Sequence, residues 1–244
     1  MKYLLIILFS FNCLSADDLS AVTFEDEKIN TEKSFKTRSS AFYIAAIYAY
    51  QAIEVGNSGT TALSEFSPGL ELEYISEKKE FSHYASASYL RSIYQQSKVN
   101  ELKDNTADII DLTIGSEYSF SKSFDFGLRI KNQSVVVIEK QTSQISNVKT
   151  VNANSIGSTI SFTLLEKNKR DDLEFNLNLE YDYLLKSEAT SHGQMSIGLE
   201  LVKRSKLQEV KTNLTYSKSE YEYMNEAQSF NQIQLSVAIS FGEK

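Results

Sequence analysis

Two histidines and one cysteine are the first side chains to consider for covalent or metal chemistry in this sequence. Cys13 lies in a leader that we expect to be removed, so the mature chain would have no thiol nucleophile and no disulfide. His83 begins an expected strand, and His192 lies in an expected loop at the opposite end of the molecule. Neither stands in an Asp-x-His or His-x-Ser pattern, and a zinc site needs several ligands together. We therefore expect no enzymatic activity, no cofactor and no metal site.

A more informative set of side chains consists of acids that recur at alternate positions of apolar segments. If the segments are strands, these polar positions share one face. That face carries more acids than bases: Glu71, Glu73, Asp111, Glu117, Asp125, Glu174, Glu180, Asp182 and Glu200 against Arg129, Lys131 and Lys211. Because removing an ion from water costs several kcal/mol, the excess of acids favours a wet interior in which mobile cations supply the missing charge. The alternative is a closed polar interior whose central acids pair with the three bases.

The segments that carry these residues alternate with a period of two. In residues 109–120, Ile110 and Leu112 fall on one face while Asp111 and Thr113 fall on the other. A helix would scatter the apolar residues around its axis, whereas a strand gathers them on one side. Two of the segments, residues 40–54 and 81–96, are apolar or small on both faces, so their facing stays open. Strands are predicted over residues 40–54, 66–75, 81–96, 109–120, 124–131, 156–164, 173–183, 194–202, 208–217 and 231–241.

The connections between the predicted strands are alternately short and long. Short polar connections fall near residues 76–80, 121–123, 165–172 and 203–206, and mostly longer ones near 55–65, 97–107, 139–152, 184–193 and 222–230. This rhythm is typical of an all-β, up-and-down antiparallel barrel that crosses a membrane, with short periplasmic turns and longer external loops. We expect ten strands, with eight or twelve as alternatives, and an even number returns both ends of the barrel to the periplasm.

Aromatic residues would form a belt near each rim of such a barrel. The expected periplasmic belt contains Tyr118, Phe120, Phe124, Phe126, Phe162 and Phe241. The expected external belt contains Tyr181, Tyr183, Tyr221 and Phe230. Two belts are what a barrel in lipid should show, because amphipathic rings settle at the depth of the headgroups.

The last predicted strand resembles the closing strand of Gram-negative outer-membrane β-barrel proteins. Its apolar residues are Ile233, Leu235, Val237, Ile239 and Phe241, and in this class the aromatic is usually the last residue, whereas three residues follow Phe241 here. The resemblance covers residues 40–241 as architecture. It implies an outer-membrane location, contact with outer-membrane lipids and lipopolysaccharide, and recognition by the barrel-assembly machinery.

The first residues have the charged, apolar and small-residue order of a secretory signal peptide, which predicts cleavage after Ala16. The rival interpretation is a lipoprotein leader cleaved before Cys13. Residues 17–39 mix acids and bases and have few apolar side chains, as expected of a disordered periplasmic extension, with a plug that enters the barrel as the alternative. The domain organisation is thus a signal peptide over 1–16, an extension over 17–39 and a barrel over 40–241.

The formal net charge of −7 argues against nucleic acid as a partner. Three functions remain for a barrel with these residues. A narrow, cation-preferring pore for small solutes comes first, because it uses the inward excess of acids. A structural or surface-binding protein without transport is the alternative, and a hydrolase on the rim comes third.

Overall fold

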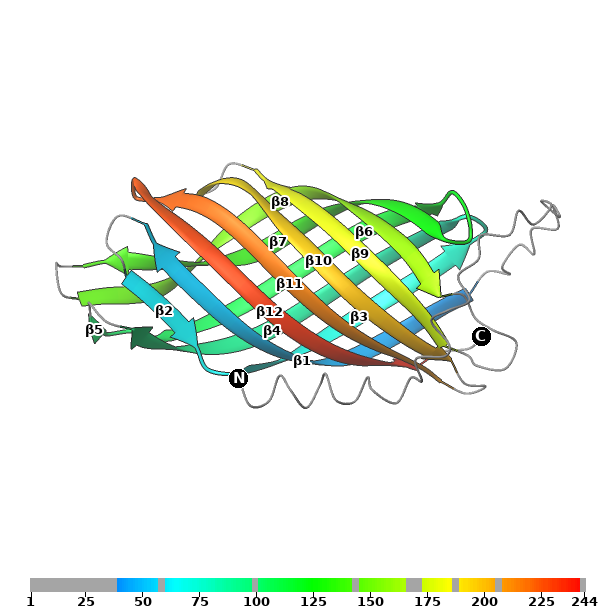
Figure 1. Cartoon of the computed structure of the whole chain (residues 1–244), viewed down its shortest axis with the longest axis horizontal. Coiled ribbons are helices and arrows are strands. Elements are labelled where there is room, and N and C mark those ends of the chain that lie inside the picture. The colour runs from blue at the N-terminus through cyan, green and yellow to red at the C-terminus, as the bar shows by residue number, and fades with distance from the viewer. Residues whose placement is uncertain are drawn as a thin grey trace, which may run out of the picture. The chain divides into compact units, whose positions relative to one another are not determined.

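A computed structural model describes residues 39–56, 60–97, 101–141, 145–165, 173–185, 189–204 and 208–241. In these ranges every regular element is a strand (Figure 1), and none is a helix long and apolar enough to span a bilayer. The leader and the extension lie outside the described residues, except Ser39, which already belongs to the first strand. The strands are β1 (Ser39–Val55), β2 (Thr60–Ser64), β3 (Ser67–Lys78), β4 (Phe81–Ser97), β5 (Glu101–Leu102), β6 (Thr106–Ser119), β7 (Phe124–Lys140), β8 (Ile145–Leu165), β9 (Leu173–Leu184), β10 (Thr190–Arg204), β11 (Glu209–Tyr223) and β12 (Glu226–Phe241).

The long strands close into one antiparallel ring. β1 pairs with β12 from Phe42 opposite Phe241 to Val55 opposite Gln228, and this pairing joins the two edges of the sheet. β2 lies beyond the end of β3 between the same neighbours, β1 and β4, so it lengthens the wall without adding a place to the ring. In the described part of the chain, the ring therefore has ten places. The predicted up-and-down barrel of about ten strands is confirmed.

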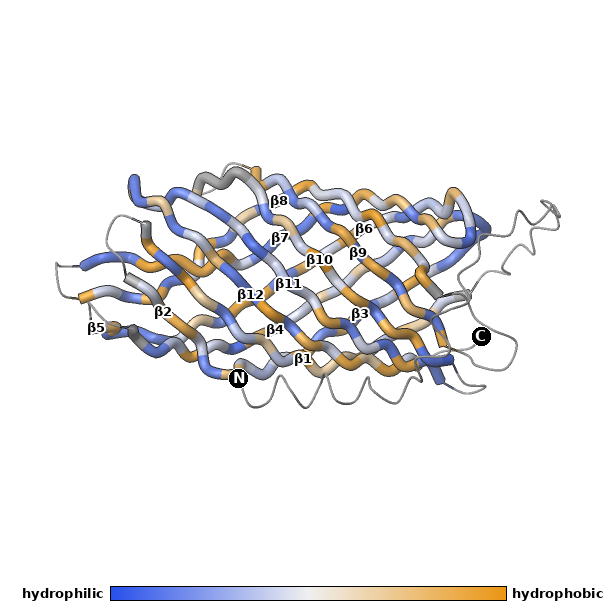
Figure 2. Tube along the Cα trace, in the orientation of Figure 1, coloured by the Kyte–Doolittle hydropathy of each residue, from blue (hydrophilic) through white to orange (hydrophobic). Residues whose placement is uncertain are grey.

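The alternation of side chains sets which face of each strand meets the surroundings. In β6, Ile110, Leu112 and Ile114 are exposed while Thr113 between them is buried. Figure 2 shows hydrophobic and hydrophilic residues alternating along the strands in this way. The facing that the sequence left open is now clear: in β1 the odd-numbered residues from Tyr43 to Val55 point inward, and in β4 the even-numbered residues from Ser82 to Tyr94 do.

The predicted rhythm of short and long connections is wrong at the external end. The segments expected as loops at 139–152 and 222–230 are mostly strand, because β7, β8, β11 and β12 continue through them as paired hairpins. The β11–β12 turn consists of Met224 and Asn225, which both have positive φ, as a tight two-residue hairpin turn requires. We call the end of the ring with Ser39 and Phe241 the periplasmic end, following the sequence-based expectation, and the opposite end the external end.

Near the external end, the apolar residues change from the outward to the inward positions of the strands. In β11, Leu214 and Tyr216 are exposed, but further along the strand Lys218 is exposed while Tyr221 and Tyr223 are buried. The same change occurs in β6 and β12. An apolar outer face suits lipid, whereas a polar outer face over an apolar interior suits water. The strands therefore extend beyond the membrane as a water-exposed β-structure with its own apolar core.

Candidate lumen and its closure

The twelve predicted lumen residues all lie on the side of their strands opposite the exposed apolar residues. Three further charged residues below the cap, Glu77, Arg204 and Glu209, share that side. Sequence reasoning missed Arg204 because it placed this residue in a turn, and missed Glu77 because the predicted strand ended at residue 75. From the segment 208–217 it took Lys211 but not Glu209. Below the cap, the inward charges of the wall are therefore eleven acids and four bases: Glu71, Glu73, Glu77, Asp111, Glu117, Asp125, Glu174, Glu180, Asp182, Glu200 and Glu209, with Arg129, Lys131, Arg204 and Lys211.

An ion-pair cluster centred on Asp182 crosses the inner wall from β7 to β9. Arg129 donates from Nε to Asp182 Oδ1 at 2.8 Å and from Nη2 to Oδ2 at 2.6 Å. Its Nη1 lies 2.9 Å from Glu180 Oε2, and Lys131 Nζ lies 3.2 Å from Asp182 Oδ2. Asp182 is fully buried, so this carboxylate depends on its two cationic partners for the charge and hydrogen bonds that water would otherwise supply.

Two glycines make room for large side chains that lie along the wall. Register places Tyr84, Gly115, Arg129, Gly157 and Asp182 opposite one another on β4, β6, β7, β8 and β9. A Cβ at Gly157 would lie 1.9 Å from Asp182 Oδ1, and a Cβ at Gly115 would lie 2.3 Å from Tyr84 Cζ. The alternation of glycine with a large residue therefore allows Asp182 to reach across β8 and Tyr84 to cover β6.

A second charged network lies nearer the periplasmic end. Arg204 pairs with Glu174 and, from Nε, with Glu209 Oε2 at 2.8 Å. Tyr43 donates its hydroxyl hydrogen to Glu209 Oε1 at 2.9 Å. Lys211 Nζ lies 4.0 Å from the centre of the Tyr43 ring. This network ties β1, β9, β10 and β11 together across one side of the lumen.

Some acids of the lumen have no close cation. No ion pair of Glu71 or Glu117 occurs among the residues that the structure describes. Lys211 Nζ is 3.7 Å from Glu73 Oε2, which is longer than a direct charged hydrogen bond. The two clusters thus satisfy only part of the inward negative charge, and the rest requires water or mobile cations.

The external part of the barrel is filled by the end of the β7–β8 hairpin. We call residues 134–140 and 145–152 of this hairpin the cap. Pairing of β6 with β7 ends at Asp111 opposite Gln133, and beyond this point the hairpin leaves the wall. In Figure 1 the ends of β7 and β8 lie at the same end of the ring as β2 and β5. β5 pairs with the first residues of β8 and covers part of the free edge of the cap.

Side chains of the opposite wall hold the cap in place. The backbone N–H of Ile138 donates to Gln228 Oε1 at 2.9 Å, and Gln228 Nε2 donates to the Ile138 carbonyl at 2.8 Å. The Tyr221 hydroxyl donates to the Val136 carbonyl. Tyr221 lies in the extension beyond the lipid-facing band, and burial raises its pKa well above the ordinary value, so the hydroxyl remains a donor. These bonds run from β11 and β12 to the facing strand β7, so the cap crosses the interior.

Both faces of the cap are buried. Val136 and Ile138 join an apolar cluster with residues of β1, β2, β4 and β6, which include Ile53 and Tyr94. On its other face the cap packs against Leu184 and the two tyrosines near the end of β11. An apolar core of this kind excludes water. The external end of the lumen is therefore closed in this structure.

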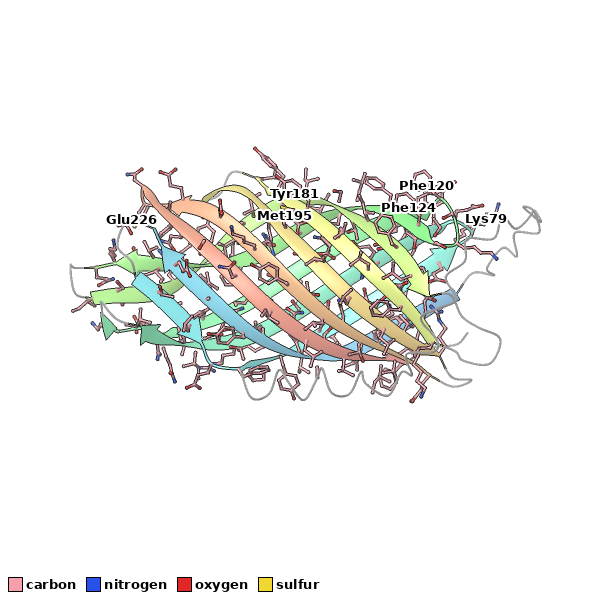
Figure 3. The ribbon with its side chains drawn as sticks, in the orientation of Figure 1. Lys79, Phe120, Phe124, Tyr181, Met195 and Glu226 are labelled. Carbon is pink, nitrogen blue, oxygen red and sulfur yellow. The ribbon has the colours of Figure 1, made fainter. Side chains whose placement is uncertain are left out.

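The structure has the predicted aromatic belt at the periplasmic rim but only part of the one predicted at the external rim. At the periplasmic rim, Phe81 contacts Tyr118, and the contacts continue through Phe120 and Phe124 to Phe162 with ring centres 4.8–5.6 Å apart. At the external rim, Tyr181 and Tyr183 are exposed, as expected. Figure 3 shows the side chains of Tyr181 and Met195 pointing away from the wall. The assignment of Tyr221 and Phe230 to the external belt is wrong, because both point inward and pack against the cap.

The two histidines lie in different settings. His83 is on the outer face of β4, where its Nδ1 lies 2.8 Å from Ser116 Oγ. His192 is not in a loop but in β10, where the pairing with β11 shifts between Ser191 and Gly193. In the described part of the chain, no group of three or more His, Cys, Asp or Glu side chains is placed to hold a metal ion.

The closed antiparallel ring, its apolar outer band and its aromatic belts define a transmembrane β-barrel of the outer membrane. No family model and no curated protein matches the sequence. A search of solved structures finds the COG4313 outer membrane channel from Pseudomonas putida F1, at 7% identity and a TM-score of 0.49 over 88% of this chain and 100% of the other. It also finds the translocator domain of the autotransporter NalP from Neisseria meningitidis, at 11% identity and a TM-score of 0.44 over 83% and 88%. The outer membrane protease OmpT from Escherichia coli matches at 8% identity and a TM-score of 0.45 over 86% and 98%.

Proposed function

We propose that this barrel is a narrow, cation-preferring channel that is closed at rest by the cap. The observation that carries the proposal is the inward excess of acids below the cap, which the four inward bases do not balance. Carboxylates that line a wet passage attract cations and repel anions. A ten-stranded wall leaves a bore between that of side-chain-filled small barrels and that of open porins, so small cations or small polar solutes are the expected permeant species.

The cap must move or be removed before the passage can conduct. Its buried apolar side chains are those of Val135, Val136, Val137, Ile138, Val148 and Val151. At about 1.5–3 kcal/mol for each apolar side chain, exposing all six to water would cost roughly 9–18 kcal/mol. Spontaneous full opening is therefore negligible at rest, and an opening signal would have to offset a cost of this size.

Removal of the cap tests the proposal. Residues 135–151 can be replaced by Asn-Gly, because Ser134 and Asn152 are directly paired and this dipeptide forms a tight hairpin turn. We expect the unmodified protein to be silent in a planar bilayer and the trimmed protein to show small, cation-selective conductance. Heat-modifiable migration on a gel checks that both proteins are folded, and both are measured with and without residues 17–38.

A milder variant guards against misfolding of the trimmed protein. Tyr221→Phe combined with Gln228→Ala keeps every cap residue but removes the side-chain bonds that hold Val136 and Ile138. We expect brief openings from this variant. If both variants fold and insert yet stay silent, the channel proposal fails.

The second candidate is a surface-binding protein without transport. The observation that favours it is the extension of the strands beyond the lipid-facing band. This extension has its own apolar core, so it would offer a rigid binding surface outside the membrane. This candidate predicts no conductance from any folded variant. A hydrolase on the rim stays the third and least supported possibility, because the two histidines belong to different strands, β4 and β10, and are not brought together.

A further inference from the structure

The outer wall of the barrel has a groove whose role does not depend on channel function. It has a volume of about 640 Å³ and crosses the outer faces of β4, β6, β7 and β8. Its floor is low because Ala85 and Ser116 are small, and larger side chains, among them Ile114, Leu128 and Ile130, line it. These residues face the hydrocarbon of the membrane, so the occupant of the groove must be lipid-soluble.

One end of the groove carries a hydrogen-bonded polar pair. The Ser116 hydroxyl lies 2.8 Å from His83 Nδ1, and both side chains belong to the groove. In the tautomer that accepts the hydroxyl hydrogen at Nδ1, Nε2 carries a hydrogen and can donate it outward. A polar group turned toward hydrocarbon is costly unless it finds a partner, so this donor calls for an acceptor on the occupant.

The depth of the pair identifies the acceptor. Tyr118 and Phe120 belong to the aromatic belt at the periplasmic rim; Tyr118 follows Ser116 on the same face of β6, and Phe120 comes directly after the end of the strand. Ser116 is two residues deeper than Tyr118, which is about 5 Å for a strand tilted by about 40°. With the belt at headgroup depth, the pair lies where glycerol esters begin. An ester carbonyl accepts a hydrogen bond, and an acyl chain fits the apolar remainder of the groove.

A cation at the adjacent turn indicates the headgroup. Lys122 is exposed in the β6–β7 turn, which connects Phe120 and Phe124 of the aromatic belt. Figure 3 shows Phe120 and Phe124 beside this end of the barrel, together with Lys79 of the neighbouring turn. Basic side chains at this level attract anionic headgroups.

We propose that this groove binds one anionic diacyl phospholipid of the periplasmic leaflet, with an acyl chain over Ala85, an ester carbonyl at the His83–Ser116 pair and the headgroup near Lys122. The lipid would seal a thin part of the wall, because the floor at Gly115 is backbone with the Tyr84 ring behind it.

Native mass spectrometry of the full protein in detergent tests the site with added dioleoyl phosphatidylglycerol or dioleoyl phosphatidylcholine. The unmodified protein should retain one phosphatidylglycerol in preference to phosphatidylcholine. Ala85→Phe should fill the groove and weaken retention about tenfold, which corresponds to lost burial of about two methylene groups. Ala87→Phe is the matched control, because Ala87 is exposed on the same face of β4, two residues away, and does not line the groove.

The headgroup is tested separately. Lys122→Gln should reduce the preference for phosphatidylglycerol by roughly two- to fivefold, as expected for one exposed charge pair, while leaving phosphatidylcholine retention unchanged. His83→Ala should weaken retention of both lipids. Equal retention of the two lipids by the unmodified protein, or equal retention by the Ala85→Phe and Ala87→Phe variants, overturns the proposal. Heat-modifiable migration confirms that each variant is folded, and neither result depends on whether the barrel conducts.

Discussion

Replacing Gly157 by alanine should destabilise the barrel through the Asp182 ion-pair cluster. The new methyl group would meet Asp182 Oδ1 at 1.9 Å and the Tyr181 carbonyl at 2.9 Å, so the carboxylate must turn away. Arg129 and Lys131 would then lose the acid between them. Overpacking alone costs about 1–3 kcal/mol, and separating a buried ion pair costs about 3–5 kcal/mol. We expect a loss between these limits, about 2–4 kcal/mol.

The matched control is Gly198→Ala, the same change at another inward-facing position. A Cβ at Gly198 would lie 3.2 Å from Asn213 Oδ1 and 3.4 Å from Thr215 Oγ1, and both are the ends of side chains that can give way. Urea unfolding in detergent micelles, followed by the loss of heat-modifiable migration, compares the two variants. Gly157→Ala should unfold at clearly lower urea than Gly198→Ala.

A double-mutant cycle separates the ion pair from general crowding. In an Asp182→Ala protein the clash partner is gone, so the additional cost of Gly157→Ala should shrink to the contact with the Tyr181 carbonyl. Equal stability of the Gly157→Ala and Gly198→Ala proteins, or strictly additive costs in the cycle, would refute this explanation of the glycine.

Three further predictions concern facing, the cap and screening. Ile114→Arg puts a charge on the lipid face and should impair assembly by about 2–4 kcal/mol. Ser88→Arg puts the same charge inside the barrel between Glu71 and Asp111 and should be tolerated. The refolding yields of the two variants in lipid vesicles test this difference. Tyr221→Phe removes the bond to the Val136 carbonyl and should destabilise the cap by about 1 kcal/mol, seen as faster hydrogen exchange in residues 134–140 and not in β10. Cation selectivity of the trimmed channel should fall between about 0.1 M and 1 M salt, where the Debye length drops from about 10 Å to about 3 Å, and selectivity that is independent of salt would contradict a role for the lumen charges.

The wall was predictable from the sequence because alternation is a local signal. Each of the ten predicted segments became a strand. In the alternating ones the signal is direct, since Ile110, Leu112 and Ile114 in β6 must share a face whatever the rest of the chain does. The pairing of Tyr84 over Gly115 could not be predicted, because it depends on the register of two strands and on the direction of a side chain.

The cap had a sequence signal that the prediction did not use. Four consecutive apolar residues, Val135 to Ile138, are typical of a strand that is buried on both faces, not of a wall strand or a loop. The change of phase in β11, from Leu214 and Tyr216 to Tyr221 and Tyr223, was also visible. It marks the point where the strand leaves the lipid, and the assignment of Tyr221 to a lipid belt obscured it.

The reversal potential of the cap-trimmed protein in a salt gradient tests the central proposal most directly. The account predicts a cation-selective potential that shifts toward zero when Glu71, Glu117 and Glu200, three acids without an ion pair among the described residues, are replaced together by glutamine. The matched change of Glu54, Glu65 and Glu220, which are exposed and lie outside the inward charged set, should leave the potential unchanged. An anion-selective or unselective potential, or no current from folded and inserted protein, would contradict the account.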